Sequence, residues 1–119
     1  VFSDISYGFK LLQNRVHKAG NVYCESTTGA WASRKLVADH SAFGLYTTAA
    51  TTDFVYFEDK DDETQREVLF SVTSPGTVNL DFFSDVSGDD CSGEALNAQL
   101  TGTKNGIPFD LSTIIQRRL

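Results

Sequence analysis

Residues 68–82 read VLFSVTSPGTVNLDF, and this stretch decides the fold class. Apolar residues occupy every second position on both sides of a central Ser74-Pro75-Gly76-Thr77. The alternating positions are Val68, Phe70 and Val72, then Val78, Leu80 and Phe82. A period of two is typical of a strand with one buried face, and Pro followed by Gly suits a type II turn. The stretch therefore predicts two β-strands joined by a tight turn.

The N-terminal segment has a different period and predicts an amphipathic helix. Its apolar residues recur at steps of four, three and four, which places them on one helical stripe. They are Ile5, Phe9, Leu12 and Val16. Ser3 or Asp4 can cap the start, and Gly20 predicts a stop at a left-handed glycine.

Further strand candidates follow the helix, with turn signals about every ten residues. They span residues 22–24, 30–38, 42–52, 54–57, 96–101 and 107–109. Asn105-Gly106 is a strong hairpin signal because both residues accept positive φ, and Pro108 confines its strand to an edge. Leu111, Ile114 and Ile115 suggest a short C-terminal helix, capped by Asp110 or Ser112.

This order of elements predicts an α+β fold that is mostly antiparallel β, sandwich- or barrel-like, with a helix at each end. The chain has 119 residues, of which 40% are hydrophobic and 22% are charged. This length and composition suit one compact domain over residues 1–119. No apolar run approaches the ~20 residues of a membrane span. The net charge of −6 disfavours non-specific binding to nucleic acid, whose phosphates require Lys and Arg.

Cys24 and Cys91, the only cysteines, lie too far apart for a redox motif and are too few for structural zinc. We expect a disulfide, which would stabilise the fold by about 4 kcal/mol in the chain-entropy model, and hence a secreted, extracellular protein. Two buried thiols in a cytosolic protein are the alternative. A start at Val1 without Met fits removal of a signal peptide and fits trimming equally well. Arg117-Arg118 fits either a processing site or the cationic end of a helix.

One catalytic hypothesis involves His40, Glu58 and Arg66. A metal-free nuclease can use a carboxylate as base, a histidine as acid and an arginine for the phosphate charge. An N-terminal helix followed by an antiparallel sheet also resembles the small guanyl-specific fungal ribonucleases. The resemblance is one of architecture alone, and the second catalytic histidine that it implies on a late strand is missing here.

Acidic residues gather at residues 58–63 and again around Cys91. The second cluster comprises Asp85, Asp89, Asp90 and Glu94, which are weak calcium candidates. Calcium requires about six to eight oxygen ligands, and neither cluster has the EF-hand pattern. We expect solvated loops and no cofactor.

Trp31 and Phe83 are the candidate binding residues, because aromatic side chains beside Asn, Asp and Thr are used on sugar- and protein-binding surfaces. A lone tryptophan in a small domain is more often buried, and we expect that of Trp31. The preferred hypothesis is a non-enzymatic secreted binding protein, effector-like, toxin-like or a surface-recognition module, that contacts a protein or a glycan. The alternative is a small secreted hydrolase, a ribonuclease, that uses His40, Glu58 and Arg66.

Overall fold

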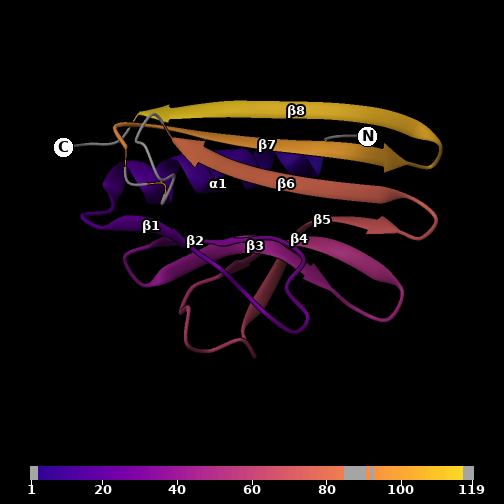
Figure 1. Cartoon of the computed structure of the whole chain (residues 1–119), viewed down its shortest axis with the longest axis horizontal. Coiled ribbons are helices and arrows are strands. Elements are labelled where there is room, and N and C mark those ends of the chain that lie inside the picture. The colour runs from indigo at the N-terminus through magenta and orange to yellow at the C-terminus, as the bar shows by residue number, and fades with distance from the viewer. Residues whose placement is uncertain (1–2, 85–90, 92, 117–119) are drawn as a thin grey trace.

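The computed structural model describes residues 3–84, 91 and 93–116. Within these residues, one helix, α1 (Ser3–Lys18), precedes eight strands in two open sheets (Figure 1). The strands are β1 (Val22–Glu25), β2 (Lys35–Ala38), β3 (Ser41–Thr47), β4 (Thr51–Phe57), β5 (Arg66–Thr73), β6 (Thr77–Ser84), β7 (Ala95–Lys104) and β8 (Ile107–Gln116). The orders are β1-β2-β3-β4-β5 and β6-β7-β8, and every pair is antiparallel. The expected antiparallel β-rich fold is confirmed in its sandwich-like form.

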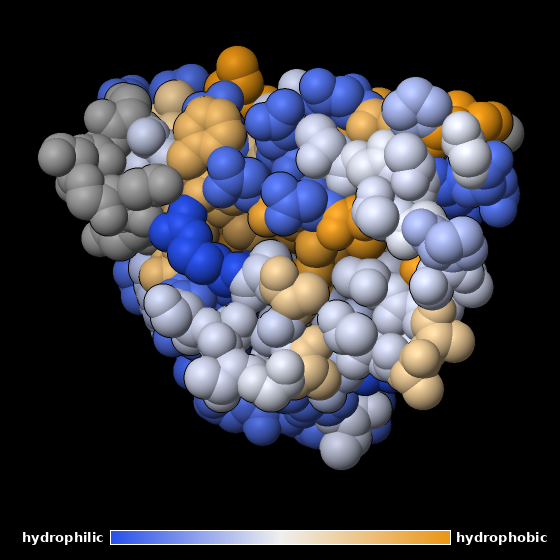
Figure 2. Space-filling model, turned by 45° about the vertical axis from the view of Figure 1, so that its right-hand side comes forward, coloured by the Kyte–Doolittle hydropathy of each residue, from blue (hydrophilic) through white to orange (hydrophobic). Residues whose placement is uncertain are grey.

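The two sheets lie one above the other in Figure 1, and α1 runs behind the strands and packs against β5 and β8. As its spacing predicts, α1 buries Ile5, Leu12 and Val16. Phe9 is half-buried and meets Phe54 of β4 edge to face, with ring centroids 6.3 Å apart. One buried cluster contains residues of α1 and of both sheets. In the view of Figure 2, hydrophobic residues reach the surface in patches near the middle, between hydrophilic ones.

The end of α1 differs from the expectation. Gly20 does not adopt positive φ, so the left-handed glycine stop is wrong. The carboxylate of Asp39, in the turn after β2, instead accepts hydrogen bonds from the backbone amides of Gly20 (3.2 Å) and Asn21 (3.0 Å). A tertiary contact thus satisfies backbone donors that the chain exposes as it leaves the helix.

Residues 68–82 form the two expected strands, β5 and β6, but these lie in different sheets. The connection turns at Thr73, whose carbonyl accepts a bond from the Gly76 amide (2.9 Å), and the Ser74–Pro75 bond is cis. Pro75 is therefore the third residue of this turn, which excludes the type II geometry. The turn carries the chain from one layer to the other.

The strands expected at 30–38 and 42–52 are shorter in the structure. The first is β2 alone, with an isolated bridge at Trp31, and the second is divided between β3 and β4.

The expected C-terminal helix is wrong, because residues 107–116 form β8 and pair with β7 along its whole length. Phe109 and Ile115 point into the core, whereas Ile114 is 68% exposed. The backbone pairing of β8 with β7 outweighs the helix-like spacing of Leu111, Ile114 and Ile115. The Asn105-Gly106 turn is confirmed, with φ of 55° and 78°. The strand β8 lies at the edge of its sheet, as Pro108 requires.

The expected disulfide is present between Cys24 on β1 and Cys91. Cys91 lies between β6 and β7 in the sequence, so the bond joins the five-stranded sheet to a connection of the other sheet. Cys91 is fully buried. Within the described part of the chain, no helix has the length and apolar character needed to cross a membrane.

Candidate functional site

The outer face of the five-stranded sheet, turned away from α1, carries a second apolar cluster. Ala42, Val55 and Phe57 on β3 and β4 are fully buried there, although they are separate from the main core. Trp31 and Tyr46 pack against them. The Trp31 ring lies 5.5 Å from Tyr46, nearly perpendicular to it, and 5.4 Å from Phe57. The three rings form a fixed aromatic platform.

Backbone pairing places Trp31 over this face. Ala30 and Ala32 run along β3, where the Thr47 amide donates to the Ala30 carbonyl (2.7 Å) and the Ala32 amide donates to the Leu45 carbonyl (2.9 Å). Below the indole lies Gly44, where a Cβ would come within 2.7 Å of Trp31 Cζ3. The missing side chain of Gly44 is therefore what lets the indole approach the sheet.

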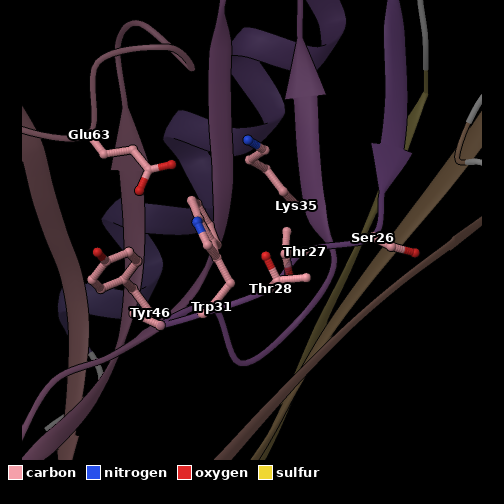
Figure 3. Close-up of a pocket in the computed structure, with 9 residues that line it drawn as sticks. Ser26, Thr27, Thr28, Trp31, Lys35, Tyr46 and Glu63 are labelled. Atoms are coloured by element: carbon pink, nitrogen blue, oxygen red, sulfur yellow. The ribbon is translucent and has the colours of Figure 1, made fainter.

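A groove of about 430 Å³ opens beside Trp31. This volume falls within the roughly 300–1,000 Å³ of ordinary ligand pockets. Its lining residues come from separate segments: Ser26, Thr27, Thr28, Gly29, Ala30, Trp31, Lys35, Tyr46 and Glu63. In Figure 3 the charged ends of Lys35 and Glu63 lie on opposite sides of the Trp31 ring. Lys35 Nζ is 5.3 Å from the indole centroid and 3.2 Å from the Glu25 carboxylate.

Hydrogen bonds hold the loop between β1 and β2 that forms one wall of this groove. Thr27 Oγ1 donates to the Ser33 carbonyl (2.6 Å), and Ser33 Oγ accepts the Leu45 amide (2.9 Å). Arg34 donates to the Phe82 carbonyl and lies 3.8 Å from Cys91 Sγ. The loop is tied to β3, to the second sheet and to the disulfide, so its wall is preorganised for binding.

Of the two candidate binding residues, the structure places Trp31 in the groove and Phe83 outside it. We expect burial of Trp31, and the structure has it half-buried. Phe83 is partly buried on β6, in the other sheet, and lines no part of the groove. Sequence reasoning missed Thr28, Tyr46 and Glu63, because only the fold brings their three segments together.

The residues of the catalytic hypothesis are only partly brought together. His40 and Glu58 line one small pocket, of about 210 Å³, at the end of α1. Its other lining residues are Arg15, Lys18, Ala19, Ala38, Asp39 and Ser41. Arg66 lies elsewhere, with its guanidinium 4.6 Å from the centroid of the Tyr46 ring on the outer face. The arginine beside Glu58 is Arg15, at 3.3 Å.

We call this pocket the polar pocket, and Tyr56 is connected to it through Glu58. Its hydroxyl donates to the Glu58 carboxylate and lies 3.4 Å from Ser41 Oγ. Burial, together with the hydrogen bond to Glu58, raises the pKa of Tyr56 above the usual value. The pocket thus contains a carboxylate, an arginine and a histidine, and the neutral phenol of Tyr56 holds that carboxylate from outside the pocket lining.

Three of the calcium candidates, Asp85, Asp89 and Asp90, lie outside the described residues, and the fourth, Glu94, is exposed. Arg117-Arg118 also lies outside the described residues. Among the residues that the structure does describe, no three His, Cys, Asp or Glu side chains are grouped as metal ligands would be. In the other acidic segment, Asp61 pairs with Lys60 at 3.2 Å and is itself exposed.

Compared with protein-family models, curated protein sequences and solved structures, the chain matches none. Function is therefore inferred from the groove and from the polar pocket.

Proposed function

We propose that the chain is a secreted glycan-binding protein and that the Trp31 groove is its binding site. The observation that carries the proposal is an indole fixed from below by Gly44 and Phe57, at the wall of a groove rich in hydroxyl groups. The C–H bonds on one face of a sugar ring pack well on the electron-rich face of an indole. Thr27 and Thr28 supply hydroxyls beside it.

The charged residues of the groove suit the same ligand class. Carboxylates accept and ammonium groups donate hydrogen bonds, so Glu63 and Lys35 can bind sugar hydroxyls from the two sides of the indole. Lys35 lies over the indole with its Nζ paired to the Glu25 carboxylate at 3.2 Å, and its flexible stem lets a sugar ring displace it. The binding hot spot of a protein–protein interface is dominated by desolvated Trp, Tyr and Arg side chains. Small polar residues form much of the lining of this groove, which favours a glycan over a protein as the ligand.

A direct test uses the fact that Trp31 is the only tryptophan. The purified protein is applied to an array of mannose, glucose, galactose, xylose and N-acetylglucosamine oligomers. Hits are then titrated by intrinsic fluorescence, in which every change in indole emission comes from the groove. We expect saturable emission changes, and a loss of at least about tenfold in affinity in Trp31→Ala, equivalent to ~1.4 kcal/mol, measured by calorimetry.

Tyr7→Ala is the matched control for this variant, because Tyr7 is an exposed aromatic residue on α1, at 53% exposure, that lines no part of the groove. It should bind as the unmodified chain does. No binding to any glycan on the array, by a protein whose circular dichroism and melt show that it is folded, would refute the proposal.

A second candidate is phosphodiester hydrolysis at the polar pocket. The observation that favours it is that His40 and Glu58 line the same pocket together with Arg15. A bound phosphodiester would compete with Glu58 for Arg15 and release the carboxylate as a base. Glu58 would take the proton of the 2′-hydroxyl that attacks the phosphorus, and His40 would protonate the 5′-oxygen that leaves. Arg66, which lies over Tyr46, takes no part in this version.

The test is cleavage of single-stranded RNA without added metal. His40→Ala and Glu58→Gln should each reduce the rate by about 10²-fold or more. His17→Ala is the control, because His17 is also exposed but lies outside this pocket. Absence of cleavage by the unmodified chain, or equal rates in all three variants, excludes this candidate.

A further inference from the structure

A second hollow, of about 280 Å³, lies next to the groove and shares Ser26, Thr27 and Trp31 with it. Its remaining lining residues, Ala32, Ser33 and Arg34, follow Trp31 in the sequence. The three shared residues, Ser26, Thr27 and Trp31, therefore separate the two hollows, and we call them the ridge. Together the two hollows extend the candidate binding surface beyond the groove itself.

We infer that the ligand is a linear oligosaccharide that crosses this ridge, with Trp31 between two neighbouring subsites. The inference rests on the proposed function and adds the class of glycan. Thr28 and Glu63 line only the first hollow, whereas Ala32 and Arg34 line only the second. A ligand that reaches Ala32 from Thr28 passes Thr27 and Trp31, which line both.

The ridge is rigid enough to hold such a chain in one register. Its ends are tied by the bond from Thr27 Oγ1 to the Ser33 carbonyl (2.6 Å) and by the pairing of Ala32 with Leu45 (2.9 Å). When a second ring is linked to a bound first ring, it adds contacts without a second loss of overall translational freedom. Affinity should therefore rise with chain length and level off once both hollows are filled.

The test measures binding against chain length, with oligomers of one to six units from the glycan class that gives the strongest array signal. Calorimetry and Trp31 emission are recorded together. The expected result is a gain of about tenfold or more between one unit and the plateau. Equal affinity at every length, with binding still dependent on Trp31, would overturn the extended site and leave the proposed function standing.

Variants separate the two hollows. Ala32 is exposed and lines only the second, so Ala32→Glu should fill that hollow and remove the gain with length, while short oligomers bind as before. Ala49→Glu introduces the same side chain at an exposed position of the β3–β4 turn, outside both hollows. It should retain the full gain. An unchanged length profile in Ala32→Glu would contradict the second subsite, and failure of every oligomer to bind would refute both proposals.

Discussion

The two faces of the five-stranded sheet use large aromatic residues for different purposes. Phe54 and Phe57 lie three residues apart on β4, and both are fully buried. Phe54 faces inward, where Phe9 of α1 packs on it. Phe57 faces outward, where Trp31 covers it and leaves a groove beside itself. The inner face is closed by a helix and a second sheet, whereas in the described part of the chain the outer face is covered by its own side chains, which can also meet a ligand.

The largest expected effect comes from shortening these two phenylalanines. Phe54→Ala should cost about 4 kcal/mol of unfolding free energy, because it opens a cavity in the main core. Phe57→Ala should cost less, about 3 kcal/mol, because the outer cluster is small. Only Phe57→Ala should shift the Trp31 emission of the folded protein. Urea titrations followed by circular dichroism and by fluorescence check both effects, and equal emission shifts would contradict the separation of the faces.

Loss of the disulfide should have the next largest effect. Cys24→Ser combined with Cys91→Ser should lower the unfolding free energy by about 3 kcal/mol, less than the chain-entropy value of about 4 kcal/mol because a compact denatured state gains less freedom. Thermal melts of this variant and of the unmodified chain, the latter with and without reductant, measure the effect. Because Arg34 contacts Cys91 Sγ at 3.8 Å, the loop between β1 and β2 should also become more mobile. Glycan affinity should therefore fall at temperatures where the variant is still folded. Unchanged affinity would show that the groove does not depend on this tie.

A smaller effect is expected at Gly44. In Gly44→Ala the new methyl group meets Trp31 Cζ3 at 2.7 Å. Overpacking of this kind costs about 2 kcal/mol of unfolding free energy. It should displace the indole, change its emission and weaken glycan binding. Gly20→Ala is the control, because its Cβ would meet Asp39 Oδ1 at 3.9 Å, an ordinary contact. Similar melts and similar binding for the two variants would mean that Trp31 does not rest on Gly44.

The smallest effect concerns pH. The pKa of Tyr56 is raised in the folded protein, so folding favours the neutral phenol. Its contribution is fully present below the unfolded pKa of about 10 and is lost as the pH rises through the higher folded value. Stability should fall above about pH 10, and Tyr56→Phe should flatten that fall. Parallel profiles of the two proteins in urea titrations would contradict this assignment.

Much of the fold was accessible from local patterns in the sequence. The stripe from Ile5 to Val16 predicts α1, and Asn105-Gly106 predicts the final hairpin. The distribution of strands between the sheets was not accessible, because the turn at Pro75 carries no signal that β5 and β6 have different partners. The helix expected near Ile114 failed because pairing with β7 outweighs a local spacing that suits both structures.

The candidate site was less predictable than the fold. Trp31 was identified from its type and its polar surroundings, but Tyr46 and Glu63 reach it only through the pairing of β3 and the path of the loop after β4. His40 and Glu58 do share a pocket, whereas Arg15 has the position expected for Arg66, because α1 ends beside Glu58. Contacts between distant segments decide a site, and no local pattern encodes them.

The most direct test of glycan binding at the Trp31 groove is an NMR titration with the oligosaccharide of highest affinity. The changes in backbone amide and indole N–H chemical shifts then map its binding site on the protein. We predict shifts concentrated at residues 26–34, at Tyr46 and at Glu63, with the Trp31 indole signal among the largest. Shifts concentrated at Arg15, His40 and Glu58 instead would move the functional site to the polar pocket and contradict the proposed function.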